Sequence, residues 1–67
     1  MQIEGKELSV ESQFDPVTYV PNHVNGNAKH QDCEQGVIIG WNDSTVKVLY
    51  CKGRTIQSTN PKDLVWG

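Results

Sequence analysis

The apolar residues between positions 17 and 66 come in short runs separated by polar, turn-forming residues. Within several of these runs apolar and polar residues alternate, which is the pattern of β-strands with one buried face. The pattern predicts five strands, at residues 17–20, 37–41, 45–51, 54–58 and 64–66. In the third strand Val46, Val48 and Tyr50 are spaced two apart, so we expect them to form its core face. Ile56 is expected to be the inward residue of the fourth strand.

The second predicted strand is apolar on both faces, because Ile38 alternates with Val37, Ile39 and Trp41. Two apolar faces favour a central strand that is covered on both sides. Gly40 lies inside the strand, and a glycine at such a position commonly marks a bend. The strand is therefore expected to be central and curved.

Tight turns join the later strands. Asn42–Ser44 has the composition of a hairpin turn, because Asn and Asp tolerate left-handed conformations. Lys52–Gly53 predicts the next hairpin, with Gly53 expected to supply the positive φ angle. Before the last strand, Asn60 is a helix-capping residue and Pro61–Asp63 fits a single 3-10 turn with proline at its first position.

Successive strands joined by short hairpins predict an antiparallel sheet, and closing such a sheet removes its exposed edges. The order of strands, turns and the late 3-10 turn predicts an all-β fold. Its expected form is a small SH3-like five-stranded antiparallel barrel over residues 14–67, with a long first loop. Residues 1–13 hold too few apolar residues for an amphipathic helix, and they are expected to form an N-terminal arm or an edge strand.

The long first loop, residues 21–35, holds most of the candidate binding residues. Loops of this length are uncommon in compact domains and are often functional. Its polar side chains include His23, His30, Asp32 and Glu34. Trp41 is added as a nearby aromatic residue, because aromatic side chains beside a loop often anchor a bound peptide.

The same loop holds candidate metal ligands. His23, His30 and Cys33 could bind zinc, with Cys51 as a fourth ligand, because zinc favours tetrahedral Cys and His sites. The spacing of His23, His30 and Cys33 is not that of a standard zinc knuckle. An alternative is that His30 and Asp32 hold the loop by hydrogen bonds while Cys33 acts as a small apolar residue. A Cys33–Cys51 disulfide is a third alternative, which requires an oxidising compartment.

Composition narrows the classes of function. A chain of 67 residues forms one domain with a small core and leaves no room for a deep catalytic cleft in one copy. The formal net charge is -2 and the six basic residues are scattered, which argues against a nucleic-acid-binding face. No signal peptide or membrane-spanning run is expected, so the predicted location is the cytoplasm of a bacterial host, where both cysteines would be thiols.

Several segments resemble a family of short uncharacterised phage and prophage proteins. They are Val-Thr-Tyr-Val-Pro-Asn-His at 17–23, His-Gln-Asp-Cys-Glu-Gln-Gly-Val at 30–37 and Pro-Lys-Asp-Leu at 61–64. The His-x-Asp-Cys-Glu cluster is the most specific part, and the similarity covers roughly residues 14–66. The resemblance implies an SH3-like fold and a viral or prophage origin, but no particular reaction.

A shorter stretch, residues 36–41, resembles the small plasmid-encoded, trimethoprim-resistant dihydrofolate reductases, which are also SH3-like and build one active pore from several copies. The tyrosine of their Val-Gln-Ile-Tyr pore motif has no counterpart in Thr55–Ser58.

The sequence therefore predicts a non-enzymatic interaction module that binds a host or viral protein through the 21–35 loop and adjacent aromatics, as a monomer or weak oligomer without cofactor. Two other classes stay open. One is a nucleic-acid-associated SH3-like module. The other is a small-molecule binder or enzyme formed by oligomerisation.

Overall fold

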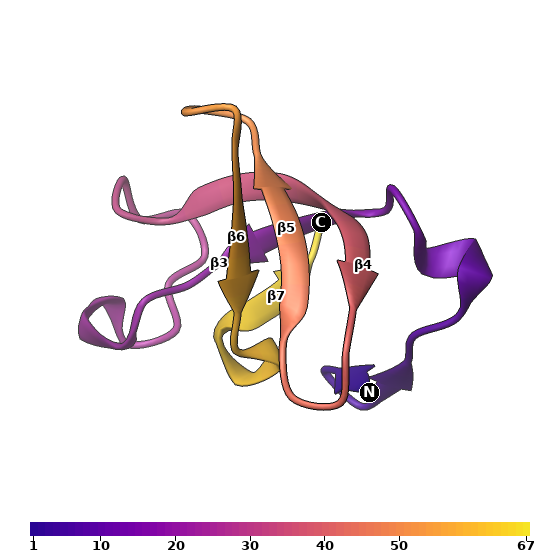
Figure 1. The fold of residues 1–67 in the computed structure, drawn as a ribbon. Helices are drawn as coiled ribbons and strands as arrows, with labels where there is room; N and C mark the ends of the chain where they lie inside the picture. Colours follow the sequence, from indigo (N-terminus) through magenta and orange to yellow (C-terminus); the bar gives the residue numbers. More distant parts are fainter.

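The computed structural model describes residues 1–67 and contains β-strands and short 3-10 turns (Figure 1). The strands are β1 (Gln2–Ile3), β2 (Lys6–Glu7), β3 (Pro16–Tyr19), β4 (Glu34–Trp41), β5 (Val46–Tyr50), β6 (Thr55–Thr59) and β7 (Leu64–Trp66). The 3-10 turns are η1 (Val10–Ser12), η2 (Asn22–Val24) and η3 (Pro61–Asp63). The predicted all-β class is confirmed.

Five strands form one antiparallel sheet in the order β6-β5-β4-β3-β7, and β1 and β2 form a separate hairpin. No pairing joins β6 to β7, so the sheet is not the closed barrel that the sequence predicted. Strand β7 is only three residues long and pairs with β3 alone, so β6 and β7 are the two edges of the sheet.

Strand β4 is central and bends, as its sequence predicted. Figure 1 shows it running alongside β3 at its start and turning to lie beside β5 at its end. The register shifts between Ile38 and Gly40, which leaves Ile39 as an extra residue opposite β5. A bulge of this kind bends a strand and increases its twist. Strand β4 pairs with β3 over residues 34–37 and with β5 over residues 36–41, so the bulge lies in the part that pairs with β5 alone.

The core lies on the inner face of this bent sheet. Its buried members are Ile3, Leu8, Val17, Ile38, Val46, Val48, Tyr50 and Leu64. The predicted inner face of β5 is thus confirmed. On β4 the buried residues are Gly36 and Ile38, whereas Val37, Ile39 and Trp41 are half-buried.

The prediction that Ile56 points inward is wrong, because its side chain is 60% exposed. Ile56 pairs with Leu49, which lies between the inward residues Val48 and Tyr50. Paired residues share a face of the sheet, so the pairing places Ile56 on the outer face. Thr59, which pairs with Val46, is the buried residue of β6 instead.

The turn after β5 also differs from its prediction. The positive φ angle belongs to Arg54, at 51°, and Gly53 is not among the residues with positive φ. The turn spans four residues, Cys51–Arg54, so the left-handed position falls at its end rather than at the glycine. The other two turns form where they are predicted, although neither Asn42 nor Asp43 has the positive φ angle that the prediction for the first of them relied on. Asn42 Oδ1 accepts the Thr45 backbone N–H at 2.8 Å, and Asn60 Oδ1 caps η3 by accepting the Lys62 N–H at 3.0 Å.

Residues 1–13 pack against the end of the sheet through β1, which contacts β7 and η3. The β1–β2 turn has positive φ at both Glu4 and Gly5, as a tight hairpin turn requires. Trp66 Nε1 donates to the Ile3 carbonyl at 2.9 Å, and the Trp66 backbone N–H donates to Glu4 Oε1 at 2.7 Å. Trp66 therefore connects the chain's first hairpin to its last strand.

Candidate functional site

The chain between β3 and β4, residues 20–33, folds as a series of turns and not as an extended excursion. It begins with η2, whose Val24 side chain is buried, and Asn25 and Gly26 then turn the chain with positive φ angles. The His30 N–H donates to the Asn27 carbonyl and the Cys33 N–H donates to the His30 carbonyl, both at 3.0 Å. These bonds give the loop a defined backbone. Figure 1 shows the loop and the N-terminal segment on opposite sides of the strands.

A hydrogen bond between His23 and Asp32 joins the two arms of this loop. The Nε2–Oδ2 distance is 2.7 Å, and the His23 N–H must donate because an ionised carboxylate only accepts. This hydrogen bond is the main cause that lowers the pKa of Asp32 below its ordinary value of 3.8. The desolvation of the carboxylate opposes it, and the charges of His30, His23 and Lys52 add to the lowering.

His30 contacts the same aspartate through the backbone. Its Nδ1 accepts the Asp32 N–H at 3.0 Å, so Nδ1 carries no proton in this arrangement. The 3.9 Å separation between that nitrogen and Asp32 Oδ2 is therefore an ion pair only when His30 is protonated, which is the form whose charge lowers the pKa of Asp32. The His23 and His30 rings lie edge to face, with centroids 6.1 Å apart. The structure thus brings His23, His30 and Asp32 together, and their contacts hold the loop in shape.

The candidate metal ligands are only partly gathered. Cys33 Sγ donates to the Asn27 carbonyl at 3.2 Å, and Cys51 lies exposed in the turn after β5. Both cysteines are free thiols. No three His, Cys, Asp or Glu side chains are arranged to hold a metal ion.

Glu34 and Trp41 lie at opposite ends of β4. Trp41 packs against the core and lines a shallow apolar hollow with Val10, Gln13 and Ile39, well away from the histidines in the fold. Glu34 begins the strand at the base of the loop, directly paired with Tyr19 at the end of β3. Of these two candidates, Glu34 therefore belongs to the loop surface, and Trp41 belongs to a separate surface.

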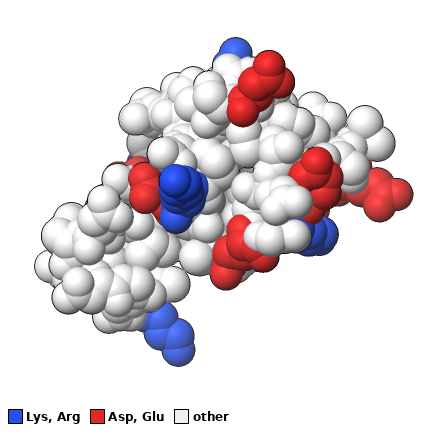
Figure 2. Space-filling view, turned by 90° about the horizontal axis from the view of Figure 1, so that it is seen from below, with Lys and Arg blue, Asp and Glu red and all other residues white.

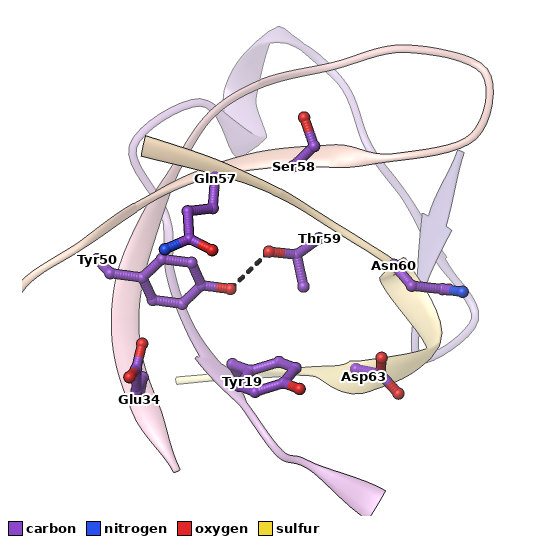
Figure 3. Close-up of a pocket in the computed structure, with 8 residues that line it drawn as sticks. All are labelled: Tyr19, Glu34, Tyr50, Gln57, Ser58, Thr59, Asn60 and Asp63. Carbon is purple, nitrogen blue, oxygen red and sulfur yellow. Dashed lines mark hydrogen bonds between the residues drawn. The ribbon is translucent and has the colours of Figure 1, made fainter. Parts of the chain in front are cut away.

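A groove of about 340 Å³ lies at the base of the loop (Figure 3). Eight residues line it, and they come from β3, β4, β5, β6, the residue before η3 and the end of η3. The Tyr19 and Tyr50 rings meet edge to face with centroids 6.4 Å apart and planes at 79°. Tyr50 is buried, and its hydroxyl shares a 2.6 Å hydrogen bond with Thr59 Oγ1. This bond fixes one wall of the groove.

The groove has an acidic character. Glu34 and Asp63 line it, no Lys, Arg or His side chain does, and neither carboxylate forms an ion pair within the chain. Burial raises the pKa of Tyr50 above its ordinary value of 10.0, the hydrogen bond with Thr59 opposes this, and the negative charges of Glu34 and Asp63 raise it further. In the view of Figure 3, Tyr19 lies between the two carboxylates.

Part of this groove could be found from the sequence. Tyr19 and Glu34 flank the long loop, and two strands joined by a loop place its ends side by side. Tyr50 and Asp63 carry no such signal, because their approach depends on the curvature of the sheet and on the position of η3.

The distribution of charge on the surface follows the composition. Figure 2 shows acidic and basic side chains interspersed over the face that it presents, without a continuous basic area.

None of the helical segments approaches the length and apolar character that crossing a bilayer requires.

Comparison with known proteins found no match: no family model, no curated protein and no solved structure is similar to this chain. The geometry of the loop and the groove is therefore the basis for a proposed function.

Proposed function

We propose that this chain is a small, non-enzymatic protein-binding module with an SH3-like arrangement of strands. Two features support the SH3-like interpretation: the strand order β6-β5-β4-β3-β7, and the positions of the long loop before β4 and of η3 before β7. The resemblance to short phage and prophage proteins supports a viral origin, and hence a host or viral protein as the partner.

The observation that carries the proposal is the groove at the base of the long loop. It is an open hollow of about 340 Å³, lined by Tyr19 and Glu34 at the two ends of the loop and by Asp63 of η3. Tyrosine side chains are frequent anchors of protein interfaces, and carboxylates at such a surface select partners by charge. A segment of a partner protein lying across Tyr19 and Glu34 would contact both the loop and the groove.

The experiment is capture of proteins from a bacterial lysate with the immobilised chain and matched variants. Glu34→Arg reverses one exposed charge at the groove, and Glu11→Arg reverses one exposed charge on η1, outside both loop and groove. We expect a retained protein that is lost with Glu34→Arg and kept with Glu11→Arg. If nothing is retained above the blank resin, or if both variants behave alike, the proposal is wrong.

The loop is tested in the same experiment by Asp32→Ala. This change removes the 2.7 Å hydrogen bond to His23 without touching the residues that line the groove. We expect weaker retention, because the partner would have to order the loop as it binds. Unchanged retention would limit the binding surface to the groove itself.

A further inference from the structure

Two carboxylates in the groove lack a partner of opposite charge. Glu34 and Asp63 both line the groove, and the ion pairs of the chain involve only Glu7 and Asp32. None of the six basic residues lines it either. A groove with this charge attracts cations and repels phosphate, sulfate and carboxylate groups.

The aromatic side chains of the groove also favour a positively charged ligand. The Tyr19 and Tyr50 rings form two walls that meet at 79°, and the half-buried Tyr19 ring borders the groove. The face of an aromatic ring carries partial negative charge, so a cation placed over it is attracted. The same chain already contains such a contact, since Lys6 Nζ lies 4.8 Å from the centre of the Trp66 ring.

The size and chemistry of the groove indicate which kind of cation fits it. A volume of about 340 Å³ lies at the small end of ligand sites, which span roughly 300–1,000 Å³, so it suits one side chain and not a large ligand. A guanidinium group is planar, stacks on aromatic rings and donates hydrogen bonds to a carboxylate in pairs. An arginine side chain could therefore stack on the Tyr19 ring and bind the carboxylates at once.

We infer that the groove formed by Tyr19, Glu34, Tyr50 and Asp63 binds the guanidinium group of an arginine on the partner protein. This inference rests on the proposed function and names the chemistry by which the partner is recognised. Glu34 and Asp63 accept hydrogen bonds from the guanidinium, and the half-buried Tyr19 ring contacts its plane, while the buried Tyr50 ring supports Tyr19 from behind. Thr59 holds Tyr50 in place through the 2.6 Å hydrogen bond and acts as a positioning residue.

The test is an NMR titration of the isotope-labelled chain with N-acetyl-arginine amide, and with N-acetyl-citrulline amide as the neutral isostere. We expect saturable shifts at Tyr19, Glu34, Tyr50 and Asp63 with the arginine probe alone. The absence of saturable shifts, or equal shifts with citrulline, would overturn the inference.

A pair of double variants distinguishes an effect of the groove carboxylates from an effect of the net charge of the chain. Glu34→Gln with Asp63→Asn removes both carboxylates, and we expect the arginine probe to bind about tenfold or more weakly, because hydrogen bonds to charged groups are lost. Glu11→Gln with Asp43→Asn removes the same charge from exposed positions outside the groove. This control should bind as the wild type does, and equal weakening in both would overturn the inference. The spectra themselves report whether each variant is folded.

The result is distinguishable from that of the lysate experiment. If a protein is captured through Glu34 but the arginine probe shifts no groove resonance, the inference fails and the binding module stands. If the probe binds in the groove but no protein is retained, the binding module fails and the cation site stands.

Discussion

The β4–β5 pair and the loop of residues 20–33 are held by opposite kinds of interaction. The strand pair buries Ile38, Val46 and Val48 completely. The loop is joined by the hydrogen bond between His23 and Asp32, whose side chains are 63% and 49% exposed. Burial of an aliphatic side chain contributes about 1.5–3 kcal/mol, whereas exposed ion pairs contribute about 0–1 kcal/mol.

These two regions should therefore differ in how well they tolerate substitutions. Strand residues determine whether the sheet forms at all, because they supply most of a small core. Loop residues determine only the local shape of the surface beside the groove. A binding surface can therefore vary on this fold without loss of the fold, as long as β4 and β5 keep their inner face.

The largest expected difference in the free energy of unfolding is between substitutions on the two faces of the sheet. Ile38→Ala removes a completely buried side chain and should lower the free energy of unfolding by about 2–5 kcal/mol. Ile56→Ala makes the same change at a side chain that is 60% exposed, and it should alter that free energy by less than about 0.5 kcal/mol. Urea unfolding followed by tryptophan fluorescence measures both. Equal losses would mean that β6 is paired in another register.

The next effect concerns the close approach of β4 to β5. A Cβ atom added at Gly36 would lie 2.6 Å from the Leu49 carbonyl oxygen and 2.6 Å from Val48 Cγ1. Gly36→Ala must therefore push the strands apart, and we expect a loss of about 1–3 kcal/mol in the free energy of unfolding. Gly40→Ala is the matched control, because nothing lies within 4 Å of its added Cβ. If Gly36→Ala unfolds at the same urea concentration as Gly40→Ala, the strands do not meet as described.

Strand pairing explains which parts of the fold could be predicted. The face formed by Val46, Val48 and Tyr50 follows from alternation alone, so it was predicted correctly. The direction of Ile56 depends on its pairing with Leu49, and a shift of one residue reverses every side chain of a strand. No local pattern in Thr55–Thr59 carries that register.

The candidate site divides in the same way. The polar residues His23, His30 and Asp32 were visible as a group in one loop, and the structure places them in contact. The approach of Tyr50 and Asp63 was not visible, because they come from different elements that the bent sheet brings together. Contacts between residues of one segment can be predicted from the local sequence, whereas contacts between distant elements are much harder to predict from it.

An intermediate effect is expected where the groove meets the core. Tyr50→Phe removes the hydroxyl that bonds to Thr59 and leaves the buried Thr59 Oγ1 without its partner, which should cost about 1–3 kcal/mol in the free energy of unfolding. The pKa of Tyr50 is raised above 10.0 in the folded chain. Its contribution is therefore fully present below pH 10.0 and is lost as the pH rises through the raised pKa. Urea unfolding at neutral and alkaline pH should show a smaller decline for Tyr50→Phe than for the wild type.

The smallest effect lies in the loop, and it should be local. Asp32→Asn weakens the hydrogen bond from His23, so the amides of the loop should exchange with solvent faster while those of β4 and β5 do not change. Because the pKa of Asp32 is lowered below 3.8, the wild-type contact stabilises the loop above that pH and is lost as the pH falls through the lowered pKa. Hydrogen exchange and amide shifts measured while lowering the pH should show this transition in the wild type and not in Asp32→Asn. Asp43→Asn, an exposed carboxylate in the turn after β4, is the control. If Asp32→Asn also accelerated exchange in β4 and β5, the loop would be part of the cooperative core, and the distinction between the two regions would fail.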